Sequence, residues 1–324
     1  MTQSNTFVTG TDKPWNDLLI HIGYPRTGTT WLQRVVFGTN VDHFDGPFYA
    51  LNRPKKESTW KTVKCHPLFF DPTTVRKHYT DRYLADGRSK FPVVSNERLS
   101  GDAMSGGYDQ KEIADRLAST FPEARILITI REQKDSIRSW YAYYLLCGGT
   151  CSLSQFIDPL LRAYRIPHFD RNFFAYDRLI EYYRSLFGED RVLVLPYENF
   201  RASPESQVRA IVDFCEEEFE IRIPEDLRLS VAPSLAVLRL RRFINPFIRR
   251  DPVNGYSSLA IERALPLVTK IHRSIEWVMP HKLKTRYNKK ISEEVESIIG
   301  DYYAASNRIT QQFTTYRLDE HGYY

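Results

Sequence analysis

The chain has no apolar run of the length that spans a bilayer, which takes about 18 residues or more. Its first 15 residues, MTQSNTFVTGTDKPW, are polar and lack the apolar core of a secretory signal. We therefore expect residues 1–14 to form a loose arm and the protein to be cytoplasmic. The sequence also lacks internal repeats and low-complexity segments.

Cysteine is scarce: Cys65, Cys147, Cys151 and Cys215 are the four in 324 residues. So few cysteines in a chain of this length do not make a disulfide framework, and reduced thiols in a reducing compartment are expected. Cys147 and Cys151 have no second Cys or His pair nearby. No metal site is therefore predicted.

The charge is not strongly of one sign, since the formal net charge is +5. This balance does not indicate nucleic-acid binding, but it suits an anionic ligand. Two late basic clusters fit an anionic glycan or an anionic membrane surface, although solvated helix faces are the favoured interpretation. Nothing in the sequence determines the oligomeric state. The clusters are Arg239, Arg241, Arg242, Arg249 and Arg250, and Lys282, Lys284, Arg286, Lys289 and Lys290.

Alternating strand and helix patterns predict an α/β fold with a P-loop-type parallel sheet flanked by helices. From residue 224 to residue 324 the pattern is mostly helical, and no linker divides residues 1–324 into two domains. The polar segment 51–88 is expected to be a lid or insertion. Strands are predicted at 18–22, 91–95, 126–130 and 191–195, with helices at 110–121, 135–146 and 177–187.

The segment 18–33, LLIHIGYPRTGTTWLQ, predicts a strand, a tight loop and the start of a helix. Such a junction binds anions, because unpaired N–H groups and the positive end of the helix dipole meet there. Gly23 and Gly28 nearly fit the pattern G-x-x-x-x-G-K-[ST], but Thr29 replaces the lysine. The loop carries Arg26 instead, which predicts phosphate binding unlike that of an ATPase with magnesium.

A second anion site is predicted where the strand 126–130 ends at Arg131. Charges at the carboxyl end of a parallel strand face the crevice in which α/β proteins bind ligands. Ser139 follows eight residues later, early in a helix, and can join Arg131 at a second phosphate. The alternative is a surface ion pair of Arg131 with Asp135 and a solvated Ser139. An arginine where a Walker B strand carries an acidic residue disfavours an NTPase.

These residues resemble the sulfotransferase family, whose members use 3′-phosphoadenosine 5′-phosphosulfate (PAPS). The family loop P-K-S-G-T-T-W corresponds to Pro25–Trp31, and the family's Arg with Ser eight residues later corresponds to Arg131 and Ser139. The resemblance covers about residues 17–200 and is nearest in style to bacterial and glycan sulfotransferases. It departs at Arg26, which replaces lysine and so puts that residue's catalytic role in doubt more than its binding role.

The resemblance implies that the loop binds the 5′-phosphosulfate and that Arg131 and Ser139 bind the 3′-phosphate. The implied loop residues are Arg26, Thr27, Gly28, Thr29, Thr30 and Trp31. Trp31 is expected to stack on adenine, with a core position as the alternative. The implied product is adenosine 3′,5′-bisphosphate, and no metal is required.

The catalytic base is predicted to be Glu97, which follows the strand 91–95 on the same rim as Arg26 and Arg131. The alternatives are that Glu97 pairs with Arg98 or caps a helix. His66 is the competing base, although its position before that strand does not favour it.

The sequence therefore predicts a PAPS-dependent sulfotransferase that modifies a hydroxyl or amine of a carbohydrate, glycolipid or small metabolite. Glu97 and Arg26 are its predicted catalytic residues. The alternatives are a P-loop nucleoside or metabolite kinase and a non-catalytic adenine-nucleotide-binding protein.

Overall fold

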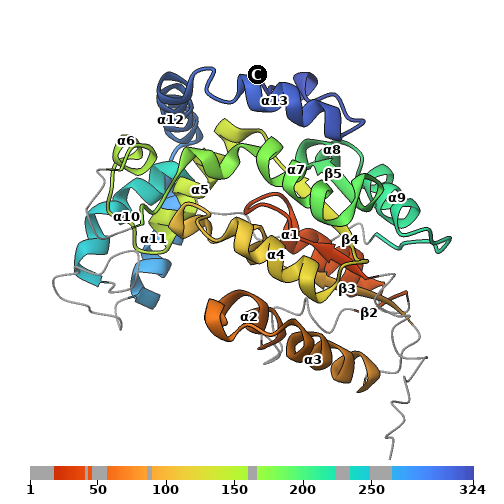
Figure 1. The fold of residues 1–324 in the computed structure, drawn as a ribbon. Helices are drawn as coiled ribbons and strands as arrows, with labels where there is room; N and C mark the ends of the chain where they lie inside the picture. The colour runs from red at the N-terminus through yellow and green to blue at the C-terminus, as the bar shows by residue number, and fades with distance from the viewer. Residues whose placement is uncertain are drawn as a thin grey trace, which may run out of the picture.

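The computed structural model describes residues 18–40, 43–45, 57–85, 90–159, 166–223, 234–248 and 265–324 (Figure 1). The predicted arm at 1–14 lies outside these residues, as do Arg249 and Arg250 of the first basic cluster. A sheet of five parallel strands in the order β2-β3-β1-β4-β5 forms the centre. The strands are β1 (Leu19–His21), β2 (Phe44–Asp45), β3 (Phe91–Ser95), β4 (Arg125–Ile130) and β5 (Val192–Pro196).

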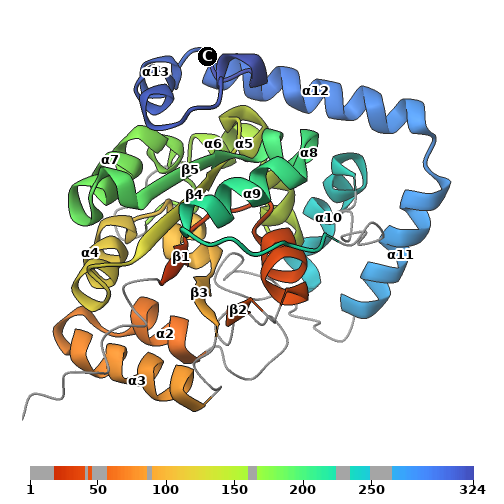
Figure 2. The same cartoon turned by 90° about the vertical axis from the view of Figure 1, so that its right-hand side faces the viewer.

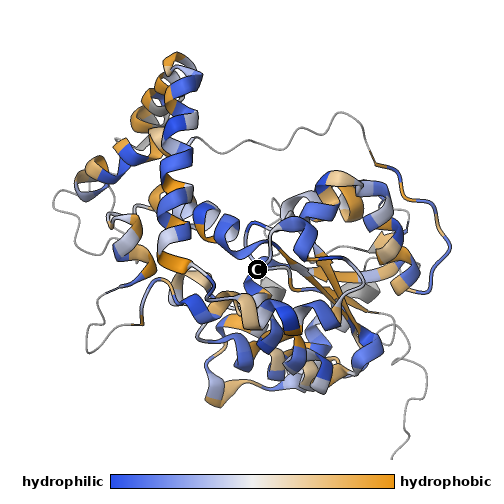
Figure 3. Ribbon diagram, turned by 90° about the horizontal axis from the view of Figure 1, so that it is seen from above, coloured by the Kyte–Doolittle hydropathy of each residue, from blue (hydrophilic) through white to orange (hydrophobic). Residues whose placement is uncertain are grey.

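Both faces of the sheet are buried, as the apolar strand sequences predict. On β4, Ile126 and Ile128 enter one apolar cluster while Leu127 enters a second, because successive side chains point to opposite faces. Helices α4 (Gln110–Thr120), α5 (Gln133–Leu146) and α7 (Tyr176–Phe187) contribute to the first cluster. The second is completed by the π-helical segment η2 (Leu32–Phe37) and by α9 (Pro204–Phe214). The expected α/β fold is confirmed, and Figure 3 shows the strands as largely apolar.

The described part of segment 51–88, which we expect to be a lid or insertion, is mostly helical. It forms α2 (Glu57–Lys64), the 3-10 turn η3 (Pro67–Phe69) and α3 (Pro72–Ala85), and both helices contact α4. Buried Arg116 of α4 donates hydrogen bonds to the carbonyls of Thr62 and Cys65, each at 2.7 Å. Val63, Val75 and Tyr79 also enter the first apolar cluster, so polar bonds and apolar packing both hold this layer. The apolar periodicity that would reveal α3 in the sequence is weak. Strand β2 was not predicted because two residues make no pattern.

The C-terminal region is helical, as expected, and returns to the sheet (Figure 2). Gln133 at the start of α5 and Asn307 exchange side-chain hydrogen bonds in a buried position. Asn307 also donates to the carbonyl of Tyr324 at 3.1 Å. The end of the chain is thereby fixed to the helix that follows β4. No helix of the described residues has the length and apolarity needed to cross a membrane.

The described residues also form helices that cover the sheet or lie away from it. They are α1 (Thr29–Trp31), α6 (Leu153–Ile157), α8 (Tyr197–Ala202), α10 (Leu235–Ile248), α11 (Leu265–Val278), α12 (His281–Ile299) and α13 (Ala304–Thr310). The short turns are η4 (Glu97–Ser100), η5 (Ala103–Ser105), η6 (Arg171–Phe174), η7 (Glu189–Arg191), η9 (Gln311–Phe313) and η10 (Asp319–His321).

Candidate functional site

The loop after β1 is held by a chain of buried polar side chains. Thr27 donates to the carbonyl of Tyr24 at 2.5 Å and shares a 2.7 Å hydrogen bond with Thr129 of β4. Thr129 in turn contacts Nε2 of His21 at 3.2 Å, and Nδ1 of His21 lies 2.8 Å from the hydroxyl of Ser95. Burial lowers the pKa of His21 to about 3, so the ring is neutral and acts as a structural link.

Two positions of this loop require glycine, one because of a close approach and one because of its backbone conformation. A Cβ at Gly23 would lie 2.1 Å from the hydroxyl of Thr129, so no larger residue fits there. Gly28 adopts φ +85°, and its carbonyl accepts from the N–H groups of Trp31 and Leu32 at 2.8 and 3.0 Å. The helical segment formed by α1 and η2 therefore begins at this glycine, which directs its unpaired N–H groups toward the loop.

The loop and the second motif meet, as predicted. Nε of Arg26 donates to Oγ of Ser139 at 3.1 Å, and Nη1 of Arg131 donates to the carbonyl of Arg26 at 3.0 Å. Arg131 also forms an ion pair with Asp135, to which its Nε donates at 2.8 Å. The alternative pairing of Arg131 with Asp135 is therefore present, but Ser139 is not simply solvated.

The guanidinium of Arg26 lies close to that of Arg131. Burial is the main cause that lowers the pKa of its guanidinium, and the positive charge of Arg131 lowers it further. Glu97, Tyr143 and Tyr197 act in the opposite direction. Two guanidinium groups this close favour an anion between or beside them.

Glu97 is exposed at the start of η4, directly after β3. Its charge acts on both Arg26 and Tyr143, which places it at the same rim as the loop. Neither alternative for Glu97 holds, because Asn96 caps this turn and Arg98 forms ion pairs with Asp102 and Asp109 instead.

His66 is exposed and caps η3, accepting from the N–H of Leu68 at 3.3 Å. Its ring nitrogen thus has a structural partner in a turn between α2 and α3. Among the described residues no hydrogen bond or ion pair joins His66 to Arg26 or Arg131.

The other loop residues differ in exposure. Thr27 and Thr29 are buried, Thr30 is exposed and Trp31 is partly buried, with its ring edge-on to Phe200 at 6.0 Å between centroids. The hydroxyl of Thr29 is buried without a hydrogen-bond partner. A Cβ on Gly23 would lie 3.1 Å from this hydroxyl and also close to Thr129 and His21, so the hydroxyl lies beside the buried polar chain beneath the loop.

Two tyrosines belong to this site and were not found from the sequence. The ring of Tyr197 lies 4.9 Å from the guanidinium carbon of Arg131 and also faces Gly28. Tyr143 follows Ser139 by one helical turn, and burial raises the pKa of its hydroxyl to about 12. Tyr197 directly follows β5, so the rule that sites collect at strand ends was the available signal.

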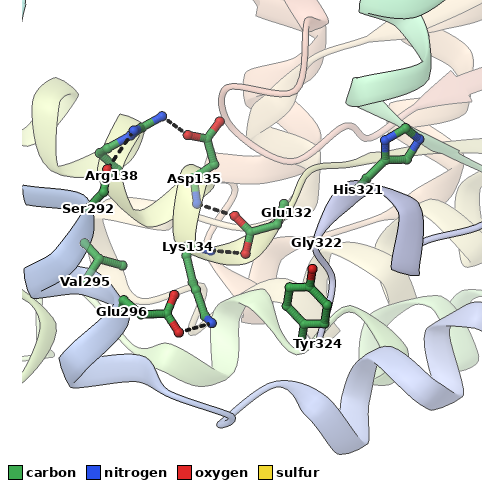
Figure 4. Close-up of a pocket in the computed structure, with 10 residues that line it drawn as sticks. All are labelled: Glu132, Lys134, Asp135, Arg138, Ser292, Val295, Glu296, His321, Gly322 and Tyr324. Atoms are coloured by element: carbon green, nitrogen blue, oxygen red, sulfur yellow. Dashed lines mark hydrogen bonds and ion pairs between the residues drawn. The ribbon is translucent and has the colours of Figure 1, made fainter. Parts of the chain in front are cut away.

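A separate cavity of about 270 Å³ lies behind Asp135, between α5, α12 and the C-terminal segment (Figure 4). Lys134 pairs with Glu296 at 2.8 Å, and Arg138 pairs with Asp135 while donating to Ser292 at 2.9 Å. Because Lys134 and Arg138 of this cavity already have carboxylate partners, they are poorly suited to bind phosphate. Within the described ranges no three His, Cys, Asp or Glu side chains are grouped to hold a metal ion.

Comparison with known proteins shows which family the middle part of the chain resembles. The family model described as "Sulfotransferase family" matches residues 109–220, which contain β4, Arg131 and Ser139 but not the loop with Arg26. This match confirms the sulfotransferase resemblance predicted from the two motifs. No curated protein matches the chain.

Three solved structures resemble the chain weakly. A sulfotransferase from Alicyclobacillus acidocaldarius is 20% identical with a TM-score of 0.47, covering 65% of this chain and 85% of that one. The sulfotransferase domain from the curacin biosynthetic pathway is 12% identical with a TM-score of 0.40, covering 87% and 96%. That of the Synechococcus PCC 7002 olefin synthase is 14% identical with a TM-score of 0.35, covering 86% and 93%. Because all three TM-scores lie below 0.5, these structures give no evidence on the function of this chain beyond the family match.

Proposed function

We propose that this chain, a sulfotransferase by its family match, transfers the sulfuryl group of PAPS to a hydroxyl of an acceptor. The contact between the two motifs carries the proposal. Arg26 donates to Ser139, and Arg131 donates to the carbonyl of Arg26, so the loop and the strand end form one cationic site. A ligand with two separated phosphoryl groups matches two arginines held on neighbouring strand ends.

The residues present fit PAPS at both ends. The N–H groups of the loop and the guanidinium of Arg26 suit the 5′-phosphosulfate. Arg131 and Ser139 suit the 3′-phosphate, which would compete with Asp135 for the guanidinium of Arg131. Trp31 is partly buried and suits contact with the adenine ring.

In the proposed reaction the acceptor oxygen attacks sulfur in line with the bond to the 5′-phosphate. The sulfur–oxygen bond to that phosphate breaks, and its electron pair leaves with the phosphate. The proton of the acceptor goes to Glu97, which is exposed at the rim. Arg26 stabilises the charge that develops on the departing phosphate.

A lysine in this position could both neutralise the leaving phosphate and donate a proton to it, whereas Arg26 can only neutralise it. A guanidinium stays charged and presents a planar set of donors, so it neutralises the leaving phosphate but does not serve as a proton source. Release of the phosphate therefore depends on charge stabilisation alone.

The test is transfer of label from ³⁵S-PAPS into a panel of glycans, glycolipids and small alcohols, without added metal. A labelled product with release of adenosine 3′,5′-bisphosphate supports the proposal. A parallel assay supplies ATP with magnesium to the same acceptors. Phosphate transfer from ATP, or no labelled product from any acceptor, would contradict it.

A further inference from the structure

Helix α10 has two opposite faces. Its inner face is fixed to the end of α5, where Asn245 donates to the carbonyls of Leu145 and Gly149 at 3.0 and 2.7 Å. Its outer face exposes Leu240, Phe243 and Phe247, which lie three and four residues apart and so form one stripe. Phe243 is 60% exposed, which is costly in water for a side chain of this size.

Helix α11 continues this apolar surface. Leu267, Ile271 and Val278 are exposed, and their spacing places them on one stripe. Trp277 beside them is 88% exposed, and Leu283 follows at the start of α12. Helices α10 and α11 contact each other, and Glu276 of α11 accepts from the N–H and the hydroxyl of Ser234 just before α10.

The charges on these helices are almost all positive. Across 235–248, 265–278 and 281–290 the sequence has ten lysines and arginines and one carboxylate, Glu276. That carboxylate is already paired with Lys284 at 2.9 Å. Arg241 is buried, and Arg242 and Lys284 are partly buried. The exposed cations are Arg239, Lys270, Lys282, Arg286, Lys289 and Lys290.

We propose that this surface of α10, α11 and the first half of α12, the apolar–basic surface, docks the protein on an anionic membrane. Exposed apolar stripes beside lysine and arginine are the pattern of helices that lie in the bilayer interface. A tryptophan side chain suits the headgroup level, where one part of the ring meets lipid and another meets water. This inference does not depend on the proposed reaction.

A second copy of the chain fits the surface less well. An isologous contact would set the cations of one copy against those of the other, with a single paired carboxylate on each side. Anionic headgroups supply the missing negative charge, because they attract lysine and arginine near the membrane surface. The positive charge of the apolar–basic surface therefore favours binding to an anionic bilayer over formation of a homodimer.

Figures 1 and 2 show α10 and α11 away from the sheet, at the side of the molecule where α12 begins. Figure 3 shows that apolar and hydrophilic residues alternate along this group of helices. Since α10 packs on α5, and α5 carries Ser139, one helix connects the docking surface to the candidate active site.

The test is co-sedimentation of the full chain with vesicles of phosphatidylcholine, with and without roughly 30 mol% of the anionic lipid phosphatidylglycerol. We expect binding to the anionic vesicles only, with a marked loss when salt is raised. The double variant Phe243→Ser/Trp277→Ser should bind at least tenfold more weakly, a loss of about 1.4 kcal/mol. The matched control is Leu68→Ser/Phe69→Ser, which removes equally exposed apolar residues from η3 and should bind like the unmodified chain.

A second variant removes charge: Lys282→Gln/Arg286→Gln/Lys289→Gln should also bind more weakly, with unchanged circular dichroism. Absence of binding to anionic vesicles, or equal binding to neutral ones, would overturn the proposal. So would equal loss in the η3 control, or a dimer in light scattering that Phe243→Ser/Trp277→Ser dissociates.

Discussion

The guanidinium of Arg26 donates a hydrogen bond to the hydroxyl of Ser139, at 3.1 Å, across 113 residues of sequence. The loop after β1 and the helix after β4 are therefore one site before any ligand is considered. Because Arg131 also donates to the backbone of Arg26, each arginine holds the segment that carries the other. Three of the predicted binding residues are thus directly connected.

Ser139→Ala removes the hydroxyl that accepts from Arg26. We expect the affinity for adenosine 3′,5′-bisphosphate to fall roughly tenfold, because a hydrogen bond to a charged group is worth about 1.5–3 kcal/mol. Fluorescence or calorimetric titration measures this. Ser185→Ala, which changes an exposed serine on α7, is the control and should bind normally. Unchanged affinity in Ser139→Ala would remove Ser139 from the site.

Arg26→Gly tests the charge in the loop without disturbing the backbone. Arg26 has φ +69°, a left-handed conformation that costs an L-residue about 1–2 kcal/mol and glycine almost nothing. The variant should therefore melt at the same temperature or higher, while turnover falls roughly 10²–10³-fold. Thermal unfolding and labelled transfer are measured on the same preparation. Loss of folding together with activity would leave Arg26 a structural residue.

Glu97→Gln removes the proposed proton acceptor and keeps the shape of the side chain. Turnover should fall roughly 10²–10⁴-fold, whereas the affinity for the bisphosphate product should be kept. Glu181→Gln, at an exposed position on α7, is the matched control and should turn over normally. Near-normal turnover of Glu97→Gln would exclude Glu97 as the base, and His66→Gln would be tested next.

Glu132→Gln tests a pH dependence of stability. Glu132 caps α5 by accepting from the N–H groups of Lys134 and Asp135, and burial raises its pKa from 4.5 to about 7. Between these values the folded state holds a proton that the unfolded state releases, so the contribution of Glu132 to stability falls as the pH rises.

Glu132→Gln has no carboxyl group at this position, so its stability lacks the pH dependence that Glu132 contributes. Relative to the unmodified chain, Glu132→Gln should gain about 1–3 kcal/mol of unfolding free energy between pH 5 and pH 8. Denaturant unfolding of both proteins at each pH measures the difference, which cancels other titrating groups such as His21. A difference that stays constant over this range would show that the Glu132 carboxyl titrates as in water.

Much of the site could be predicted from the sequence because it sits at the ends of buried strands. Apolar runs that end in Arg131 or Asn96-Glu97 identify the rim of a parallel sheet, and the structure has β4 and β3 at those places. The sequence could not show that Arg26 reaches Ser139, since a side chain's direction depends on the φ of +69° at that residue.

Other features were missed for physical reasons. Helices α2 and α3 have few apolar side chains, and Arg116 holds their layer through backbone carbonyls. Tyr197 and Tyr143 resembled ordinary core aromatics, because the sequence carries no sign that a ring faces an arginine or a loop. We predicted the ion pair of Arg131 with Asp135 only as the alternative to a functional role for Arg131. In the structure Arg131 forms this ion pair and also contacts the loop, so the two are compatible.

Calorimetric titration with adenosine 3′,5′-bisphosphate, without metal, tests the central claim most directly. The unmodified chain should bind one molecule of the bisphosphate per chain. Arg131→Ala should lose at least tenfold in that affinity, about 1.4 kcal/mol, while its affinity for adenosine 5′-monophosphate stays unchanged. No heat of binding to the unmodified chain, or an equal loss for both nucleotides in Arg131→Ala, would contradict the account.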